Sequence, residues 1–312
     1  MSLRRIATTT LKATAAVGAV GAACVAYAAV VEVRWFTLRR VTVPVLPAGA
    51  TPVKVLHLSD LHLMPTQEKK IGWVNDLIDL QPDLVVNTGD NLSHEDSVPP
   101  LLRAFGDLLD LPGVFVFGSN DYWKPHFKNP AKYLLPAHKQ RHKPHGPDLP
   151  FENMRRAFTD AGWADLNNAK ASLKLNGLRF DFAGTDDPHI KRDRYAEIAG
   201  EVDPSADLSI GVTHAPYRRV LNAFVADGYP LVLAGHTHGG QLAVPFYGAL
   251  VTNCDLDASR VKGLTTWGAE GRQAALHVSA GLGTSPYAPV RFACRPEATL
   301  LTLVPRVNSI SQ

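Results

Sequence analysis

Five short apolar runs in this chain each end in polar residues. They read VKVLHLSD (53–60), PDLVVNTGDN (82–91), GVFVFGSND (113–121), LSIGVTH (208–214) and PLVLAGHTH (230–238). A short, nearly continuous apolar run bounded by turn signals is typical of a strand that is buried on both faces. The runs therefore predict a sheet of buried strands, with polar residues where the loops leave the strand ends.

Helical patterns lie between or beside these runs, at residues 67–79, 98–110 and 217–227. Residues 172–182 alternate apolar and polar side chains around Asn176-Gly177, which predicts a β-hairpin. ALHVSAG and ATLLTLV predict two further strands near the C-terminus. We therefore expect an α/β fold with mixed sheets and a ligand site at the strand ends.

Charge and cysteine content limit the function classes. The 312 residues include 32 Lys and Arg against 29 Asp and Glu, a formal charge of +3. Such a balance does not provide the basic footprint that nucleic acids need, so no nucleic-acid partner is expected. Cys24, Cys254 and Cys294 form no Cys-x-x-Cys, which argues against a disulfide scaffold and a thiolate zinc site. A pair between Cys254 and Cys294 stays open if the domain is exported.

Residues 13–31, ATAAVGAVGAACVAYAAVV, carry no charge. About 20 apolar residues span a bilayer, so the segment predicts a single-pass anchor in a bacterial cell membrane. A cleaved export signal is the alternative, with Arg4-Arg5 as a twin-arginine pair and Ala26-Tyr27-Ala28 as the cleavage site. That would leave the protein wall-associated. A buried core helix is the third interpretation, and the basic residues on the two sides are equal in number, which leaves the orientation open.

These features divide the chain into parts. We expect a basic tail (1–12), the transmembrane or signal segment (13–31), a Pro-containing linker (32–52), a folded domain (53–304) and a C-terminal tail (305–312). Within the domain, residues 122–150 are a basic insert, in which 122–147 contain six Lys or Arg and no acidic residue. The insert is either a solvated face or a lid over an anionic substrate or anionic headgroups.

Each polar strand end carries residue types that bind metal ions. The seven candidate ligands are Asp60, His62, Asp90, Asn120, His214, His236 and His238. Carboxylate together with neutral imidazole suits Mn, Fe or Zn better than Mg or Ca, which prefer oxygen ligands. Seven ligands are too many for one ion. They suit two ions about 3.5 to 4 Å apart that share one carboxylate, an arrangement that hydrolyses phosphoesters. We expect two divalent cations, with Mn favoured.

The order Asp-x-His, Gly-Asp, Gly-x-Asn-Asp, lone His and Gly-His-x-His resembles that of the calcineurin-like metallophosphoesterases, over essentially all of residues 53–304. GHTHGGQ (235–241), GTDDP (184–188) and GLGTS with VRFACRPEATLLTL (281–303) resemble the bacterial membrane-associated branch of that family. That branch includes wall-associated phosphodiesterases and relatives of UDP-2,3-diacylglucosamine hydrolases. The resemblance implies a four-layer αββα sandwich, with two sheets inside and helices outside.

The resemblance also implies roles for single residues. Asp60, His62 and His238 would hold one ion, His214 and His236 the second, and Asp90 would bridge them. We expect Asp90, Asn120, Asp121 and His238 to be the catalytic residues. The expected reaction is hydrolysis of a phosphodiester or pyrophosphate in an anionic envelope substrate, lipid-linked substrates included. The alternatives are a catalytically weakened scaffold, or a protein or nucleotide phosphatase of the same fold.

One strand end departs from the family pattern of Gly-Asn-His-Asp, because this chain has Gly118-Ser119-Asn120-Asp121. An ungapped alignment places Ser119 at the ligand position, whereas a shift by one residue gives that role to Asn120. We favour Asn120, since an amide oxygen is the better neutral donor. Asp121 either orients a ligand from behind or caps the loop.

The departure also removes the family's general-acid histidine. Proton donation to a leaving group is typically worth ~10² to 10⁴ in rate. Either the leaving group needs little protonation, or His94, His126 or His189 replaces the missing histidine. Asp186, Asp187 and the segment 291–295 fall in branch-specific motifs, where they either shape the site or only pin loops.

Overall fold

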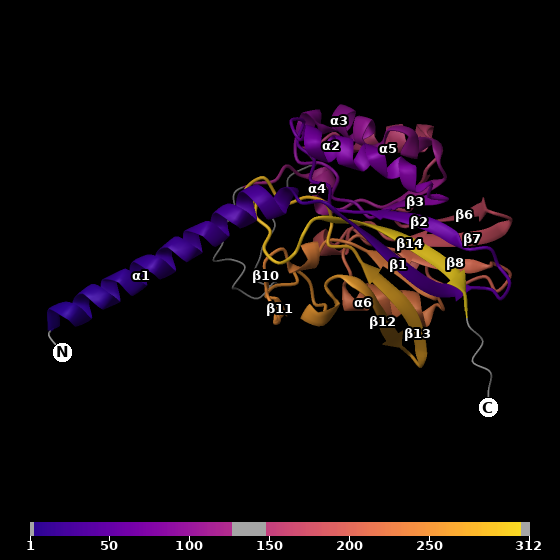
Figure 1. The fold of residues 1–312 in the computed structure, drawn as a ribbon. Coiled ribbons are helices and arrows are strands. Elements are labelled where there is room, and N and C mark those ends of the chain that lie inside the picture. Colours follow the sequence, from indigo (N-terminus) through magenta and orange to yellow (C-terminus); the bar gives the residue numbers. More distant parts are fainter. Residues whose placement is uncertain (1–2, 127–147, 307–312) are drawn as a thin grey trace.

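The computed structural model describes residues 3–126 and 148–306. Two six-stranded sheets pack face to face within the domain (Figure 1). The first has the order β1-β14-β2-β3-β4-β5, with β1 (Thr37–Leu46), β14 (Glu297–Pro305), β2 (Val53–Leu58), β3 (Leu84–Asn87), β4 (Gly113–Phe115) and β5 (Ala164–Asp165). The second has the order β12-β13-β9-β8-β7-β6, with β12 (Gly263–Ala269), β13 (Arg272–Val278), β9 (Leu231–Ala234), β8 (Leu208–Val212), β7 (Leu178–Gly184) and β6 (Ala169–Leu175).

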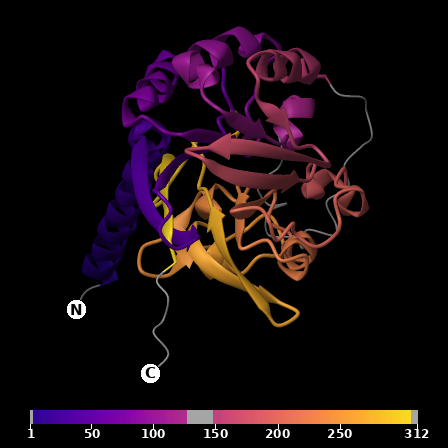
Figure 2. The same ribbon diagram turned by 90° about the vertical axis from the view of Figure 1, so that its right-hand side faces the viewer.

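Helices cover the outer faces of both sheets. The long helix α1 (Leu3–Ala26) precedes the domain, and α2 (Glu68–Asn75), α3 (Val98–Phe105), α4 (Ser119–Tyr122), α5 (Phe151–Asp160) and α6 (Arg218–Ala226) follow in chain order. Figures 1 and 2 show α2, α3 and α5 over the first sheet, and Figure 1 shows α6 on the opposite side, beside the second. The four-layer α/β/β/α arrangement expected from the sequence is confirmed.

Three apolar clusters hold these layers together. Along β2, Val53 and Val55 face the second sheet, whereas Leu56 and Leu58 face the helices, so both faces of this strand are buried. A third cluster packs α6 against the second sheet through Phe224 and its neighbours. Fully burying one such side chain stabilises the fold by about 1.5–3 kcal/mol. This explains the nearly continuous apolar runs in the sequence.

Strand direction brings the polar ends together. Strands β2, β3, β4 and β5 are parallel in the first sheet, and β7, β8, β9 and β13 are parallel in the second. Parallel strands present their carboxyl ends at one edge, where ligand sites of α/β sheets form. The expected hairpin at 172–182 is also present, as β6 pairs with β7 around Asn176-Gly177.

The expected linker over residues 32–52 needs correction, because residues 37–46 form β1. This strand pairs in parallel with β14 from Thr37 opposite Glu297 onward. Prolines in this stretch predict a linker. In the structure, Pro44 is exposed on an edge strand, where a residue without an N–H is tolerated. Val43 and Val45 are buried in the core between the sheets. The folded domain therefore begins before residue 53.

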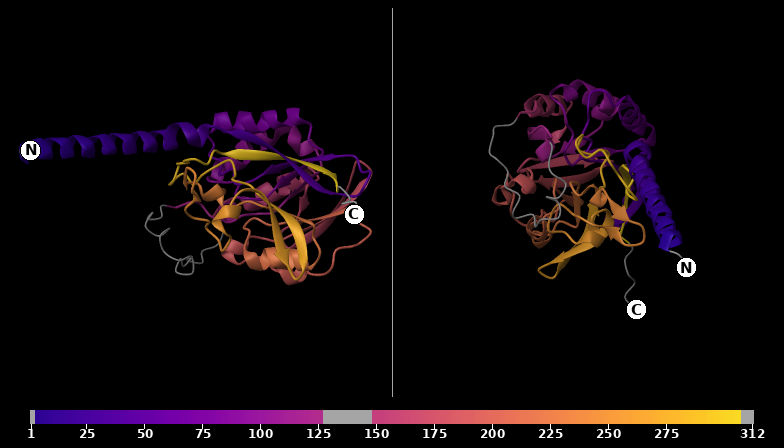
Figure 3. Two further views of the ribbon diagram at one scale, coloured as in Figure 1. Left: turned by 60° about the horizontal axis from the view of Figure 1, so that its bottom comes forward. Right: turned by 90° about the vertical axis from the view of Figure 1, so that its left-hand side faces the viewer.

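The N-terminal helix leaves the domain as a long, exposed rod (Figure 3). The segment Thr14–Arg34 is apolar and long enough to cross a membrane, and only 6% of its most apolar window is buried. This exposure contradicts the interpretation as a core helix. The last turns, Tyr27–Val31 and Glu32–Arg34, pack on the domain through Ala28 and Glu32. The three cysteines are free, so Cys254 and Cys294 form no disulfide.

Most of the basic insert lies outside the described residues. Residues 127–147 of the expected 122–150 insert are not described, and neither are residues 307–312 of the expected C-terminal tail. The prediction of a lid stays a prediction.

Candidate metal centre

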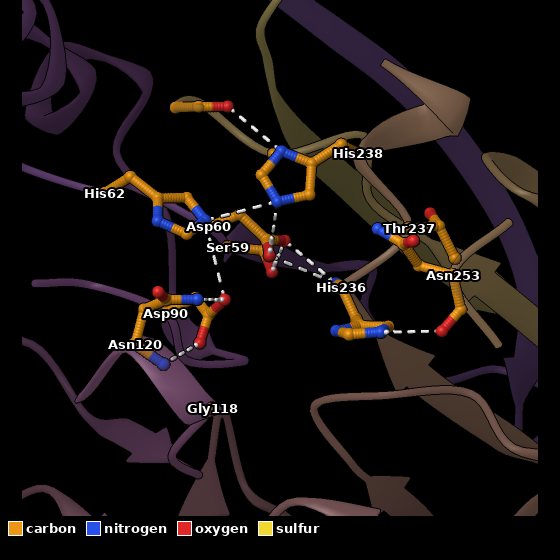
Figure 4. Close-up of polar contacts among 12 residues, drawn as sticks. Ser59, Asp60, His62, Asp90, Gly118, Asn120, His236, Thr237, His238 and Asn253 are labelled. Carbon is orange, nitrogen blue, oxygen red and sulfur yellow. Dashed lines mark hydrogen bonds and ion pairs between the residues drawn. The ribbon is translucent and has the colours of Figure 1, made fainter. Parts of the chain in front are cut away.

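A buried cluster of four metal-ligand side chains lies at the carboxyl ends of the strands. Asp60 and His62 follow β2, Asp90 follows β3, and His238 follows β9. Their ligand atoms all lie within 4.8 Å of one another. The Nε2 atoms of His62 and His238 are 3.2 Å apart, and His62 Nε2 is 3.4 Å from Asp90 Oδ2. Figure 4 shows these side chains converging on one point.

A second group lies on the other side of Asp90. The Nε2 atom of His214 is 3.5 Å from Asp90 Oδ1 and 3.2 Å from Nδ1 of His236. The amide of Asn120 donates to Asp90 Oδ2 at 2.7 Å, and its backbone N–H donates to Asp90 Oδ1 at 2.7 Å. Asp90 therefore contacts both groups, the place that a shared carboxylate between two ions would take.

The backbone of the ligands is unusual. Asp60, His62, Asp90, His236 and His238 all have positive φ, between 42° and 70°. For residues other than glycine this left-handed region is sparsely populated and costs of order 1–3 kcal/mol each, and such residues cluster at functional sites. The short turns after each strand require this conformation to aim the side chains inward.

Hydrogen bonds behind three histidines fix which ring nitrogen is free. Backbone carbonyl oxygens of Thr88, Asn253 and Gly283 accept from His214 Nδ1 (2.7 Å), His236 Nε2 (3.3 Å) and His238 Nδ1 (3.1 Å) respectively. A carbonyl only accepts, so each of these nitrogens carries a proton, and in the neutral ring the opposite nitrogen presents a lone pair to the site.

This tautomer pattern tests whether the site suits a metal ion. The free nitrogens of His214 and His236 face each other at 3.2 Å, with the Asp90 carboxylate beside them. Two facing lone pairs repel unless a cation or proton lies between them. A donor set of buried carboxylate and neutral imidazole suits a divalent cation. The residues therefore fit the expected ions.

Electrostatics agree with a site built for positive charge. Burial alone would raise the pKa of Asp90, but the neighbouring His214 and His62 hold it well below its usual range. Burial alone would lower the pKa of His214, but the carboxylate of Asp90 raises it well above its usual value. Burial, with Asp90 nearby, raises the pKa of Asp60 to about 6. Burial lowers the pKa of His62 to about 4 and that of His238 well below its usual value. Neutral imidazole is the form that binds metals, so His62 and His238 are in the binding form, whereas His214 holds a proton in the place that a cation would take.

Glycines next to the ligands leave room that a side chain would fill. A Cβ atom at Gly118 would lie 2.2 Å from Asp90 Oδ1 and 2.6 Å from the ring of His214. At Gly235 it would lie 1.9 Å from Ser59 Oγ. These are the glycines of the third and fifth strand ends, so the sequence motifs reflect close approach of the backbone to the ligands.

The third strand end is the one that departs from the family pattern. Asn120 lies against Asp90, whereas the Ser119 hydroxyl contacts the amide of Asn120, at 3.4 Å. Asp121 is fully buried and accepts from the backbone N–H groups of Asp90, Asn91 and Gly118, at 2.7 to 2.9 Å. Asp121 thus positions the loop that carries Asp90.

Of the three histidines that could replace the missing general acid, His189 is the one that contacts a candidate ligand within the described part of the chain. The ring of His189 is 4.5 Å from that of His236, and its Nδ1 is 3.0 Å from the hydroxyl of Tyr217. By contrast, His94 accepts from the backbone of Asp96 at the start of a helical turn, and His126 is exposed.

The branch-specific residues have distinct places. Asp186 accepts from the Tyr122 hydroxyl and from Arg192, so it pins two loops together. Asp187 is fully buried, one of its oxygens has no partner among the described residues, and burial raises its pKa to about 7. Arg291 is fully buried and donates to the carbonyls of Ala280, Gly281 and Gly283. Sequence reasoning missed Asn253 and Gly283, because they act through backbone carbonyls, which have no sequence signal.

The calcineurin-like phosphoesterase family matches residues 53–240, more than half of the chain. The chain belongs to this family. Membership and the buried Asp and His cluster identify the protein as a metal-dependent phosphoesterase, and the cluster fits divalent metal ions.

Relatives from bacteria and from Bos taurus align over much of the chain. The metallophosphoesterase YkuE of Bacillus subtilis is 27% identical over 273 residues, covering 83% of this chain and 81% of the relative. The phosphodiesterase YaeI of Escherichia coli is 27% identical over 287 residues, covering 88% of this chain and 90% of YaeI. A transmembrane protein with a metallophosphoesterase domain from Bos taurus is 30% identical over 215 residues, covering 65% of this chain and 44% of that protein.

Solved structures are also similar to this chain, at low identity. TT1561 of Thermus thermophilus has 14% identity and a TM-score of 0.41, covering 74% of this chain and 91% of that one. The phosphopantetheinyl hydrolase PptH of Mycobacterium tuberculosis has 12% identity and a TM-score of 0.40, covering 86% of this chain and all of that one.

Proposed function

We propose that this phosphoesterase is a phosphodiesterase or pyrophosphatase that uses two divalent cations, preferably Mn, and acts on an anionic substrate of the cell envelope. The observation that carries the proposal is the position of Asp90, which contacts His62 through Oδ2, His214 through Oδ1 and Asn120 through both oxygens. One carboxylate shared between two sets of donors suits two ions that lie close together.

The chain's own residues would divide between the two ions. Asp60, His62 and His238 would hold one, and His214, His236 and Asn120 the other. When bound, two such ions provide hydroxide near neutral pH and hold the phosphoryl oxygens for in-line attack. The backbone carbonyls behind three of the histidines keep the ligand nitrogens aimed inward, and burial keeps His238 neutral.

His189 is our candidate for the missing general acid. Its ring lies 4.5 Å from that of the candidate ligand His236, and its Nδ1 atom is 3.0 Å from the Tyr217 hydroxyl. In this role it would protonate the leaving oxygen. His189→Ala should then slow hydrolysis of alkyl phosphodiesters about 10²-fold or more, and slow p-nitrophenyl esters far less, because that leaving group departs without a proton. Equal losses on both substrates would exclude the role.

Two observations support an envelope substrate. The N-terminal segment Thr14–Arg34 is long and apolar enough for a single-pass anchor, and one relative is named as a transmembrane protein with this domain. An anchored enzyme meets lipid-linked phosphoesters at high local concentration. We propose membrane anchoring for this chain, with the cleaved, wall-associated form as the alternative.

The first experiment is Mn-dependent hydrolysis of bis(p-nitrophenyl) phosphate and p-nitrophenyl phosphate by the full chain in detergent. We expect diester cleavage that a chelator abolishes, Mn restores, and Asp90→Asn removes. Asp90→Asn keeps the shape of the side chain but loses the shared charge, and its metal content should fall. Full metal loading of the unaltered chain with no cleavage of either ester would favour the catalytically weakened scaffold instead.

A further inference from the structure

A short hairpin follows the last metal-ligand loop and presents a large apolar tip. Strands β10 (Ala243–Val244) and β11 (Gly248–Ala249) pair in antiparallel fashion shortly after the turn that begins at His238. Phe246 and Tyr247 at the tip are 112% and 78% exposed. Leu250, just beyond, is 59% exposed. Such a group of exposed apolar residues marks an interaction site.

The composition around the hairpin favours lipid as the partner. The sequence has no charged residue between His238 and Asp255. Leu242 and Val244 extend the exposed apolar surface toward the base of the hairpin. Aromatic and apolar side chains without charge are typical of segments that enter the interface of a bilayer.

The base of the hairpin is bonded to the segment that supports the N-terminal helix. Phe292 donates its N–H to the carbonyl of Gln241 (3.1 Å) and accepts from the N–H of Ala243 (2.9 Å). The neighbouring residue, Arg291, donates its N–H to the carbonyl of Ala28 in the helix (3.1 Å). The ring of Tyr27 meets that of Phe292 edge-on at 6.3 Å.

A buried carboxylate strengthens this connection. Glu32, 3% exposed at the end of the helical segment, accepts from the backbone N–H groups of Ala293 (3.1 Å) and Cys294 (2.6 Å). The segment 291–294 therefore joins the hairpin and the helix in one unit. Figures 1 and 3 agree in placing the hairpin at the end of the domain from which α1 projects.

The length of the apolar segment locates the membrane surface. Thr14–Arg34 has 21 residues, and at about 1.5 Å per residue a helix of this length matches a hydrocarbon core of about 30 Å. The last turns of this segment, from Tyr27 onward, pack on the domain, so the membrane surface lies where the helix joins the domain. At this junction Trp35 is 47% exposed and has the Arg295 guanidinium over its ring at 3.4 Å. Trp and Arg are typical of the membrane–water boundary.

We propose that the hairpin of residues 242–250 docks into the lipid bilayer beside the anchor, with Phe246, Tyr247 and Leu250 in the interfacial layer. This inference rests on the membrane anchoring in the proposed function and extends it. Two points of attachment, the helix and the hairpin, hold the domain in one orientation. The metal-ligand loop that ends at His238 leads into the hairpin, so docking brings the site close to the headgroup layer and to phosphoesters that remain in the membrane.

Depth-dependent quenching of a fluorophore tests the docking in the full chain reconstituted in liposomes. The variant Phe246→Cys, in a background of Cys24→Ser and Cys254→Ser, carries an environment-sensitive NBD label, and the buried Cys294 stays unlabelled. The matched control is Glu270→Cys, at the exposed tip of the β12–β13 hairpin. Val20→Cys, in the apolar segment, reports insertion of the anchor.

We expect the label at position 246 to shift its emission to the blue and to be quenched by spin labels near the lipid headgroups. The label at position 270 should show neither effect. An unquenched label at position 246, with position 20 quenched, would overturn the docking. A label at position 246 shielded from iodide but not quenched by lipid would overturn it in favour of a protein partner, a second copy included.

Hydrolysis of bis(p-nitrophenyl) phosphate, measured on the same liposomes, separates the two proposals. Lipid quenching at position 246 without hydrolysis would support the docking and contradict the proposed phosphodiesterase. Hydrolysis without quenching at position 246 would do the reverse. If position 20 is also unquenched, the anchor is not inserted and the inference fails with it.

Discussion

The carboxylate of Asp121 accepts the backbone N–H of Asp90 at 2.8 Å. The same side chain accepts from the backbone of Asn91 and Gly118, so it joins the loop after β3 to the loop after β4. It contacts no ligand side chain among the described hydrogen bonds. Asp121 therefore acts on the shared ligand through the backbone, as a positioning residue.

Asp121→Asn should weaken metal binding. The variant keeps one acceptor oxygen but places an NH₂ group against backbone donors, so the Asp90 loop shifts. Residues that orient metal ligands typically contribute 10- to 100-fold in affinity, and we expect a loss of about this size. Calorimetric titration with Mn measures it. Asp160→Asn, on an exposed helix end, is the control and should bind Mn as the unaltered chain does.

Gly118→Ala should disrupt the site by steric overlap. Its Cβ would meet Asp90 Oδ1 at 2.2 Å and the His214 ring at 2.6 Å, so the loop or both ligands must move. Diester hydrolysis should be lost and the metal content should fall. Gly72→Ala is the matched control, since no atom lies within 4 Å of its added Cβ. In helix α2 it should raise stability by about 0.5–1 kcal/mol and leave activity unchanged. An active Gly118→Ala variant would contradict the geometry.

The two residues of the altered motif should differ in effect. The side-chain amide of Asn120 donates to Asp90 Oδ2, so Asn120→Ala should lower Mn affinity and kcat together, while the backbone bond to Oδ1 remains. Ser119→Ala should have a small effect, because the Ser119 hydroxyl makes only a long contact of 3.4 Å with Asn120. Metal stoichiometry by elemental analysis gives the readout. The reverse order of effects would assign the ligand role to Ser119.

Arg291 should be needed for the geometry of His238. Its Nη2 atom donates to the Gly283 carbonyl at 2.7 Å, the same oxygen that accepts from His238 Nδ1. Arg291→Lys keeps the charge but reaches fewer carbonyls, and a buried acceptor left without a donor costs about 1–3 kcal/mol. We expect a lower melting temperature together with weaker Mn binding. Arg295→Lys, partly exposed over Trp35, should change neither by a comparable amount.

The buried pair His57 and His277 should make stability depend on pH. Their Nδ1 atoms are 2.9 Å apart, and burial lowers the pKa of His277 to about 4. Between about pH 6.5 and 4 the unfolded state binds a proton that the folded state does not, so stability is complete above about pH 6.5 and falls on acidification. A shift of this size corresponds to about 3 kcal/mol.

Thermal unfolding between about pH 4 and 7, in the presence of a chelator, compares the unaltered chain with His277→Gln. The variant should show a shallower loss of stability on acidification, since one buried titrating group is gone. His126→Gln, at an exposed position, is the control and should follow the unaltered chain. Parallel curves for His277→Gln and the unaltered chain would rule out the effect.

Much of the fold and site could be predicted because the information is local. The apolar run of β2 and the polar Asp60 and His62 after it follow from burial on both faces and a turn at the strand end. By contrast, the sequence predicts a linker over residues 32–52, where the structure has β1. A proline such as Pro44 indicates a linker when only the sequence is considered. The pairing with β14 shows that it lies on an edge strand, where proline is tolerated.

The sequence by itself determined the α/β class, the residue types of the site and the apolar N-terminal segment, since each depends on periodicity, residue chemistry or length. Only the tertiary structure decided that Asp90 lies between the two groups, that Asp121 holds its loop, and that the β10–β11 hairpin shares a support with the helix at Glu32. These relationships join residues far apart in the chain through backbone carbonyls and N–H groups, which nearly every residue carries. No pattern of side chains along the sequence records which of them meet.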